Sequence, residues 1–131
     1  MALQLGTAVR TSMADALVTA AAGGTIKTFS GAVPVNCAAA DPAGELSSGT
    51  LPSPALSSAS GAATKAGTWT LTGSAAGTSA SFRAYTAGAV CFAQGDVTTT
   101  GGGGVMEISS TTTAIGQVDT VTAVMLTVGG A

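Results

Sequence analysis

The hydrophobic pattern predicts an α-helix near the start of the chain. Apolar residues recur there at spacings of four, four and three, which places them along one side of a helix. These residues are Val9, Met13, Leu17 and Ala20. Thr7 has a hydroxyl that can cap the first turn, and Gly23-Gly24 favours the left-handed conformation in which many helices end. We therefore expect a helix over residues 7–23 that packs its narrow apolar stripe on the rest of the protein.

A series of short segments with the period of β-strands follows the helix. Residues 25–30 are rich in β-branched side chains, which pack well in pleated sheets. Trp69 and Leu71 alternate with threonines, and Met106 and Ile108 share one face of a later segment. Each of these patterns predicts a strand that turns one face toward a core.

Two further segments are predicted to form a hairpin. Residues 80–85 and 89–94 are joined by a tight turn at 86–88, and Phe82 shares the apolar face of the first segment with alanines. The last run of the chain, residues 118–128, is predicted to be a strand. Its apolar face is formed by Val124, Leu126 and Val128.

All four prolines fall in the turn-rich tract 31–67. Proline cannot donate a backbone hydrogen bond to a neighbouring strand, so a central strand cannot cross a proline. We expect short edge strands near residues 45–51 and 55–60. A loop of this length inside a small domain is usually functional. We therefore expect either an arm that reaches a neighbouring molecule or a flexible linker.

The spacing of the strands predicts the fold class. Several short strands with turn signals at intervals of roughly 8–12 residues are typical of a β-sandwich or a barrel. We predict a mainly β protein, with an antiparallel, jelly-roll-like β-sandwich over residues 25–131 and one short N-terminal helix. The length of 131 residues fits a single domain over residues 1–131.

Small side chains and a low charge content limit the classes of partner. Ala, Thr, Gly and Ser together outnumber all other residues, so we expect a thin core that contacts with other molecules help to stabilise. Charged residues make up 8% of the chain and the formal net charge is −2, which favours order over disorder. Such a chain has no basic face for phosphates, so a nucleic-acid partner is not expected.

Residues able to perform catalysis are scarce. The chain has no His, which excludes imidazole ligands and His-based triads. Asp41 and Glu45 are the only close pair of carboxylates, and they lie in the Pro/Gly tract, which lacks the rigidity that acid–base catalysis needs. The glycine run 101–104 has no lysine beside it and precedes a strand, so we predict a flexible hairpin connection and not a phosphate loop. We predict that the protein is not an enzyme and has no metal, cofactor or small-molecule substrate.

The termini and cysteines indicate a cytoplasmic site of synthesis. The first residues lack the basic start and dense apolar run of a secretory signal, and no stretch reaches the ~20 apolar residues of a membrane span. We therefore expect no membrane partner. Cys37 and Cys91 are expected to remain reduced, with Cys91 as a buried, inert thiol. A disulfide between them is the alternative.

Arg83 and Tyr85 are the candidate interface residues. They lie on the face of the 80–85 segment opposite Phe82, and Tyr and Arg are enriched at protein interfaces. Trp69 and Phe82 are expected in the core. A second interpretation makes Trp69, Arg83 and Tyr85 a platform for a sugar.

The order of the segments carries a family resemblance. The predicted helix is followed by residues 24–31, a proline-bearing loop, residues 67–71, 81–85 and 95–97, and a closing pair of Thr-rich strands. This order resembles that of small virion proteins of tailed bacteriophages, of the capsid decoration (cement) or minor structural kind. The resemblance covers most of the chain and carries no site residues with it.

The resemblance implies a protein made in the cytoplasm of an infected bacterium that works on the capsid surface of the virion. There it would bind the lattice of the major capsid protein and, with copies of itself arranged as a homotrimer, stabilise the head against the pressure of DNA. Our leading hypothesis is therefore a non-enzymatic capsid decoration protein. The alternatives are a tail or fibre component of the virion and a carbohydrate-binding adhesin module.

Overall fold

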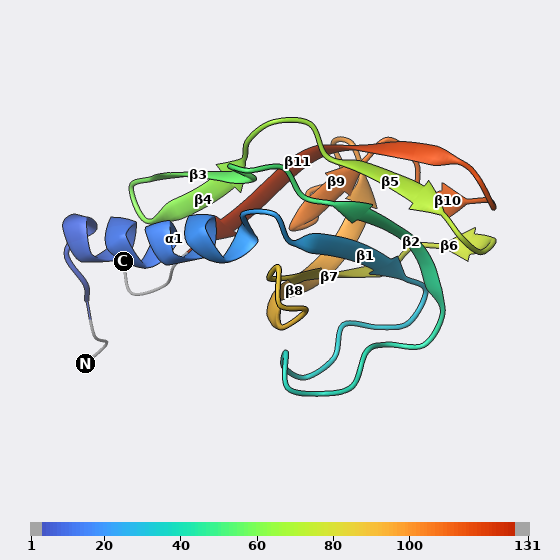
Figure 1. Cartoon of the computed structure of the whole chain (residues 1–131), viewed down its shortest axis with the longest axis horizontal. Coiled ribbons are helices and arrows are strands. Elements are labelled where there is room, and N and C mark those ends of the chain that lie inside the picture. The colour runs from blue at the N-terminus through green and yellow to red at the C-terminus, as the bar shows by residue number, and fades with distance from the viewer. Residues whose placement is uncertain (1–3, 128–131) are drawn as a thin grey trace.

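Within residues 4–127, which the computed structural model describes, the chain forms one helix and eleven strands (Figure 1). The helix α1 spans Thr7–Ala21. The strands in chain order are β1 Thr25–Phe29, β2 Glu45–Thr50, β3 Leu56–Ala59, β4 Ala62–Lys65, β5 Thr70–Gly73, β6 Gly77–Thr78, β7 Ser81–Tyr85, β8 Cys91–Thr99, β9 Met106–Ile108, β10 Thr112–Thr113 and β11 Val118–Thr127. The protein is therefore mainly β with one N-terminal helix.

Seven strands form a closed barrel, in the order β11-β5-β2-β1-β7-β8-β9. Strand β11 closes the ring, because its residues 118–120 pair with β5 and its residues 121–124 pair with β9. The ring is mixed, since β8 and β9 are parallel and the other pairs are antiparallel. The predicted antiparallel, jelly-roll-like β-sandwich over residues 25–131 is therefore wrong. A sandwich keeps two separate sheets, whereas this sheet closes on itself.

Strand β11 contains a β-bulge that changes which of its side chains face the core. The register shifts between Val121 and Ala123. As a result, Val121 and Val124 are both in the core, although residues three apart in a regular strand face opposite sides. Of the predicted apolar face, Val124 is buried and Leu126 packs against the core, while Val128 lies outside the described residues.

The run of four glycines connects two parallel strands. Val97 of β8 lies opposite Met106 of β9 in a parallel register. Parallel strands usually need a crossover of about a dozen residues or more, and glycine permits the shorter path. Gly101 and Gly103 adopt φ of 88° and 83°, and both donate their amides to the Glu107 carboxylate. The predicted hairpin at this connection is therefore wrong.

The barrel interior and the space beneath α1 share one hydrophobic core. Trp69, Leu71 and Phe82 are almost completely buried in it. The indole Nε1 of Trp69 donates to the carbonyls of Ala55 and Ala66, each at 3.1 Å, so its polar group is satisfied. The prediction that Trp69 and Phe82 belong to the core is confirmed.

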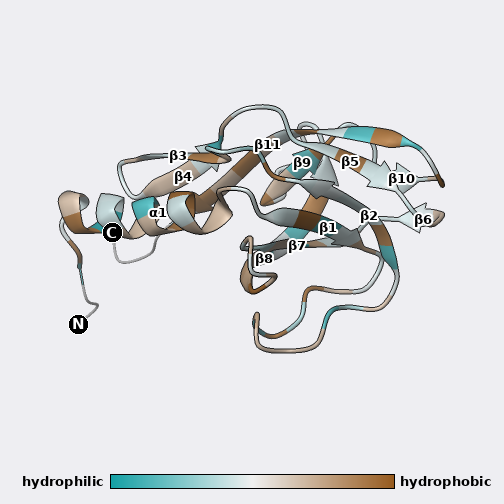
Figure 2. Ribbon diagram, viewed as in Figure 1, coloured by the Kyte–Doolittle hydropathy of each residue, from teal (hydrophilic) through white to brown (hydrophobic). Residues whose placement is uncertain are grey.

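Helix α1 packs on the β3–β4 hairpin with a different face from the predicted one. Its fully buried residues are Ala14 and Ala21. Val9 and Met13 are 53% and 45% exposed, so the first half of the predicted stripe is wrong. Leu17 and Val18 are partly buried against the core, so only Val9 and Met13 of the larger apolar side chains of α1 are left on the outside. Figure 2 shows apolar stretches along α1 as well as in the barrel strands.

The ends of α1 fall close to the predicted range of 7–23. Gly6 occupies the N-cap position, and the Thr7 hydroxyl does not cap the helix. At the other end Gly23 has a φ of 68°, and the next amide donates to the Ala21 carbonyl at 3.0 Å. The glycine pair therefore ends the helix as predicted.

The proline-bearing tract 31–67 contributes three strands to the sheet. β2 lies between β1 and β5 inside the barrel, so it is a central strand and not the predicted edge strand. This is compatible with the prolines, because they all lie outside β2. β3 and β4 form a hairpin that pairs with the end of β11. The long loop is therefore confined to residues 30–44.

The turn between β3 and β4 provides a test of stability. Ser60 and Gly61 adopt φ of 49° and 79°, and a two-residue turn with positive φ at both positions strongly prefers Asn-Gly. We predict that Ser60→Asn raises the free energy of unfolding by roughly 0.5 kcal/mol, because Asn tolerates the left-handed conformation better than Ser. Urea unfolding measures this change. Ser57→Asn, at an exposed strand position, is the control and should not stabilise the protein. Equal effects of the two substitutions would contradict the left-handed conformation of Ser60 as the cause.

Candidate functional site

Residues 30–44 form a loop that covers the outer face of β7 and β8, and we call it the covering loop. Its base is closed by two backbone hydrogen bonds, from the Ser30 amide to the Gly44 carbonyl at 2.9 Å and from the Gly31 amide to the Ala43 carbonyl at 3.1 Å. In Figure 1 the loop swings below the barrel, and its tip returns to the start of β8. The side chains of Arg83, Tyr85 and Gln94 lie beneath it and bond to it.

Arg83 of β7 holds the covering loop from below. Its side chain is 2% exposed. Nη2 donates to the Asn36 carbonyl at 3.0 Å, and Nη1 donates to the Ala39 carbonyl and to Asp41 Oδ1, both at 2.9 Å. Nε donates to Gln94 Oε1 at 3.1 Å. A buried charge is tolerated only when its donors find acceptors, so the docked loop and the guanidinium stabilise each other.

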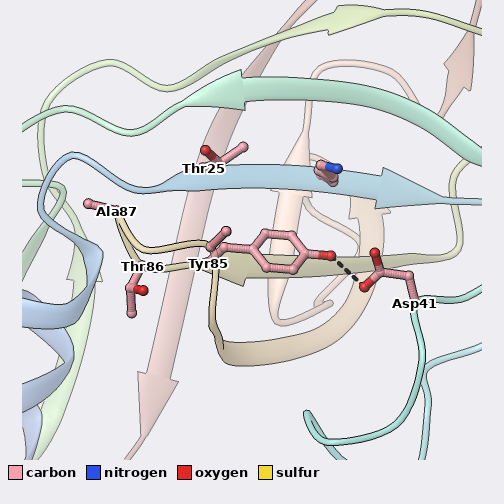
Figure 3. Close-up of a pocket in the computed structure, with 7 residues that line it drawn as sticks. Thr25, Asp41, Tyr85, Thr86 and Ala87 are labelled. Carbon is pink, nitrogen blue, oxygen red and sulfur yellow. Dashed lines mark hydrogen bonds between the residues drawn. The ribbon is translucent and has the colours of Figure 1, made fainter.

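Tyr85 contacts the same carboxylate from a second direction. Its hydroxyl donates to Asp41 Oδ1 at 2.7 Å (Figure 3). Burial and this hydrogen bond raise the pKa of the Tyr85 phenol, while the hydrogen bonds from Tyr85 and Arg83 lower the pKa of the Asp41 carboxyl. Both shifts favour a neutral phenol beside an ionised carboxylate. Tyr85 is therefore a hydrogen-bond donor here and not a base.

Lys27 of β1 lies on the other side of Tyr85. Its Nζ is 5.6 Å from the centroid of the Tyr85 ring and 3.1 Å from Glu45 Oε1. The two carboxylates that are close in the sequence, Asp41 and Glu45, thus have separate cationic partners, Arg83 and Lys27. Because each carboxylate is engaged in its own ion pair, the two are not arranged as an acid and a base across a cleft.

These side chains border an open cavity of about 380 Å³ (Figure 3). Its lining consists of Thr25, Lys27, Asp41, Tyr85, Thr86, Ala87 and Ala89. The ionisable groups of the wall are paired within the chain, and the remainder of the wall is hydroxyls and methyl groups. Among residues 4–127, no group of three or more His, Cys, Asp or Glu side chains could hold a metal ion.

A second cavity, of about 480 Å³, lies between the glycine connection and β11. Glu107 accepts the amides of Gly101 and Gly103 at 3.1 and 3.0 Å, and Asp96 accepts the amide of Val105 at 2.9 Å. A phosphate loop binds its ligand through such amides. Here the chain's own carboxylates occupy them.

Cys37 and Cys91 form a disulfide that links the covering loop to β8. Their Cα atoms lie 5.5 Å apart, within the range that a disulfide spans. The expectation of two reduced thiols, with Cys91 buried and inert, is therefore wrong. The two residues are separated by 54 positions, and only the docking of the covering loop brings them together.

The predicted interface residues Arg83 and Tyr85 lie under the covering loop, and their polar groups contact the same chain. A partner could reach Arg83, which is 2% exposed, only after the loop had moved, whereas Tyr85 also lines the open cavity. The interface role of the two residues stays a prediction. Trp69, the third member of the predicted sugar platform, is 2% exposed and lies in the core. The structure therefore brings Arg83 and Tyr85 together and separates Trp69 from them.

Asp41 and Gln94 are the residues of this site that the sequence analysis missed. Asp41 was considered only as a partner of Glu45, and Gln94 carried no signal. Pairing Cys37 with Cys91 would have placed the proline-bearing loop against β8 and thus near Gln94. The two cysteines were therefore the sequence signal for the part of this site that Gln94 and the covering loop form.

No protein-family model, curated protein or solved structure matches this chain. Across residues 4–127, no helix is both long enough and apolar enough to cross a membrane. The basis for a functional proposal is therefore the surface of this chain and the order of its segments.

The pKa shifts predict how the stability conferred by the covering loop depends on pH. The phenol pKa of Tyr85 is raised, so its contribution is complete below the ordinary tyrosine pKa of about 10 and is lost as the pH rises further. The carboxyl pKa of Asp41 is lowered, so its contribution is complete above the ordinary aspartate pKa of about 3.9 and is lost as the pH falls.

We predict that Tyr85→Phe lowers the free energy of unfolding by about 1 kcal/mol near neutral pH, because the hydrogen bond to Asp41 is lost. This difference from the wild type should shrink above pH ~10, and the corresponding effect of Asp41→Asn should shrink below pH ~4. Urea unfolding across this pH range measures both. If the free energies of unfolding of the two variants stay a constant amount below that of the wild type at high and low pH, the hydrogen bond between Tyr85 and Asp41 is not the cause of the pH dependence.

Proposed function

We propose that this protein is a non-enzymatic structural component of a tailed-bacteriophage virion, a capsid decoration protein that binds the lattice of the major capsid protein. The observation that carries the proposal is the position of its exposed apolar side chains. They include one pair on α1 and one pair around the covering loop, and Ile115, Val118 and Met125, on or beside β11, are exposed as well. Surfaces of this kind are typical of proteins that another protein covers.

Helix α1 provides the first apolar pair. Val9 and Met13 are 53% and 45% exposed and lie four residues apart, so they share one face of the helix. In Figure 1 the helix lies at one end of the molecule, beyond the barrel. This face is accessible to a neighbouring subunit without any change in the barrel.

The disulfide creates the second apolar pair. Val35 and Val90 are 89% and 63% exposed, and each is within two residues of a disulfide-bonded cysteine. The linkage of Cys37 to Cys91 therefore brings the two valines to the same region of the surface. Disulfides persist on virion surfaces and other oxidising sites, so this bond supports a protein that is made in the host cytoplasm and works outside it.

The proposed mechanism is multivalent. Each copy contributes a small apolar contact, and many symmetric copies, arranged as homotrimers, link capsid subunits whose separate interfaces are weak. The internal use of Arg83, Asp41 and Tyr85 supports a non-enzymatic role, because these groups stabilise the chain's own loop.

The alternatives are distinguished by different observations. A tail or fibre component would have few copies per virion, whereas a decoration protein would have hundreds. A carbohydrate-binding adhesin needs an aromatic platform, and Trp69 cannot supply one because it is 2% exposed.

A first experiment tests binding to capsid shells. We predict that the purified protein is a defined oligomer that sediments with shells of the major capsid protein, near one oligomer per lattice point. Val9→Gln and Met13→Gln should each weaken this binding roughly tenfold or more, because each removes an apolar side chain from the contact. Ile115→Gln, at a site 77% exposed in the connection between β10 and β11, is the matched control. A monomer that does not bind shells would contradict the proposal.

A second experiment tests the effect on the virion. We predict that virions assembled without this protein release their DNA at a lower temperature than complete virions. Release is followed by the fluorescence of a DNA-binding dye during heating. Adding back the wild-type protein should restore the heat resistance, and equal resistance with and without the protein would count against a decoration role.

A further inference from the structure

The non-covalent contacts of the covering loop lie on both sides of its cysteine. Before Cys37, the Pro34 carbonyl accepts from Gln94 Nε2 at 2.7 Å and the Asn36 carbonyl accepts from Arg83. After Cys37, the Ala39 carbonyl and the Asp41 carboxylate also accept from Arg83. The loop is therefore bound to the barrel on both sides of Cys37 by contacts other than the covalent bond.

The partner cysteine lies beside the same groups. Cys91 is opposite Tyr85 in the β7–β8 register, and Gln94 follows it by three residues on β8. Arg83 of β7 is paired directly with Gln94. The guanidinium therefore sits between the loop that carries Cys37 and the strand that carries Cys91.

We propose that Arg83 is a positioning residue for a redox lock, in which docking of the covering loop on its guanidinium brings Cys37 to Cys91 and the disulfide then fixes the loop. The inference does not depend on the proposed role in a virion. If the loop docks first, its docking is the reason that the disulfide forms. In the alternative, the disulfide forms first and orders a loop that Arg83 alone would not hold in place.

The oxidant for this step is a small disulfide such as glutathione disulfide. One cysteine thiolate attacks it, forming a mixed disulfide and releasing one glutathione thiolate. The second cysteine thiolate then displaces the other glutathione. In sum, two protein thiols and one glutathione disulfide give the protein disulfide and two glutathione molecules, so two electrons and two protons pass to glutathione.

Docking of the covering loop also determines the shape and charge of the cavity shown in Figure 3. Asp41 is part of the cavity wall and belongs to the covering loop, whereas Lys27 and Tyr85 belong to barrel strands. When the loop leaves, the cavity loses its carboxylate wall and Arg83 loses its acceptors. The shape and charge of this surface therefore depend on whether the loop is docked.

Equilibration in glutathione redox buffers tests the proposal, because it measures the effective concentration of the two thiols. We expect Arg83→Met to lower this concentration at least tenfold, since the loop loses its charged hydrogen-bond donor. Asp41→Ala, at a half-exposed site, should lower it about three- to tenfold. Asp15→Ala is the control, because this exposed carboxylate on α1 bonds only to Ser58 among the described residues; it should stay within twofold of the wild type.

The single tyrosine gives an independent measure of loop docking. In the double variant Cys37→Ser/Cys91→Ser, a loop held by Arg83 keeps the phenol buried, so the pKa of Tyr85 stays above its ordinary value. Absorbance near 295 nm after rapid pH jumps records this titration. Adding Arg83→Met should return the pKa to about 10.

Two results would overturn the proposal. The first is an unchanged effective thiol concentration in both Arg83→Met and Asp41→Ala. The second is an ordinary tyrosine pKa in the double serine variant, which would show that the disulfide alone holds the loop. If Arg83→Met does not fold, Asp41→Ala and the tyrosine titration decide the question without it.

Discussion

Closure of the sheet by β11 is the constraint on which the other features of the molecule depend. The chain is poor in large apolar side chains, so its core is thin. Pairing of the backbone groups around the full ring leaves the barrel without a free edge. β11 can do this because successive parts of this long strand pair with β5, β9 and β4. Helix α1 and the β3–β4 hairpin extend this ring, and the covering loop lies on its outside.

The position of Arg83 on the outside of the barrel determines the chemistry of that face. Its neighbours Phe82 and Ala84 point into the core, so the guanidinium must point outward, where the covering loop buries it. Burial obliges the loop to supply acceptors. The docked loop then carries Cys37 to Cys91 and completes the cavity. One buried charge thus links the loop, the disulfide and the cavity, while burial and the hydrogen bond to Asp41 keep Tyr85 neutral.

The polar groups of the covering loop and of the glycine connection bond within the chain. Arg83, Asp41 and Glu107 stabilise loops, while apolar side chains on α1 and near the disulfide remain exposed. A lattice protein needs such a balance, because its copies must be rigid and must offer apolar contacts. The proposed place on a capsid rests on this balance and on the resemblance in segment order.

The sequence by itself determined the local features: the first helix and its end at the glycine pair, the strands at residues 25–30 and 80–85, and the burial of Trp69 and Phe82. Each follows from backbone preferences and hydrophobic period over a few neighbouring residues. Only the tertiary structure decided the closure of the barrel, the parallel β8–β9 pair, the buried face of α1, the disulfide and the acceptors of Arg83. These depend on contacts between residues far apart, such as the 47 positions between Arg83 and Asn36. A local pattern shows which face of a segment is apolar, but not which segment will cover it.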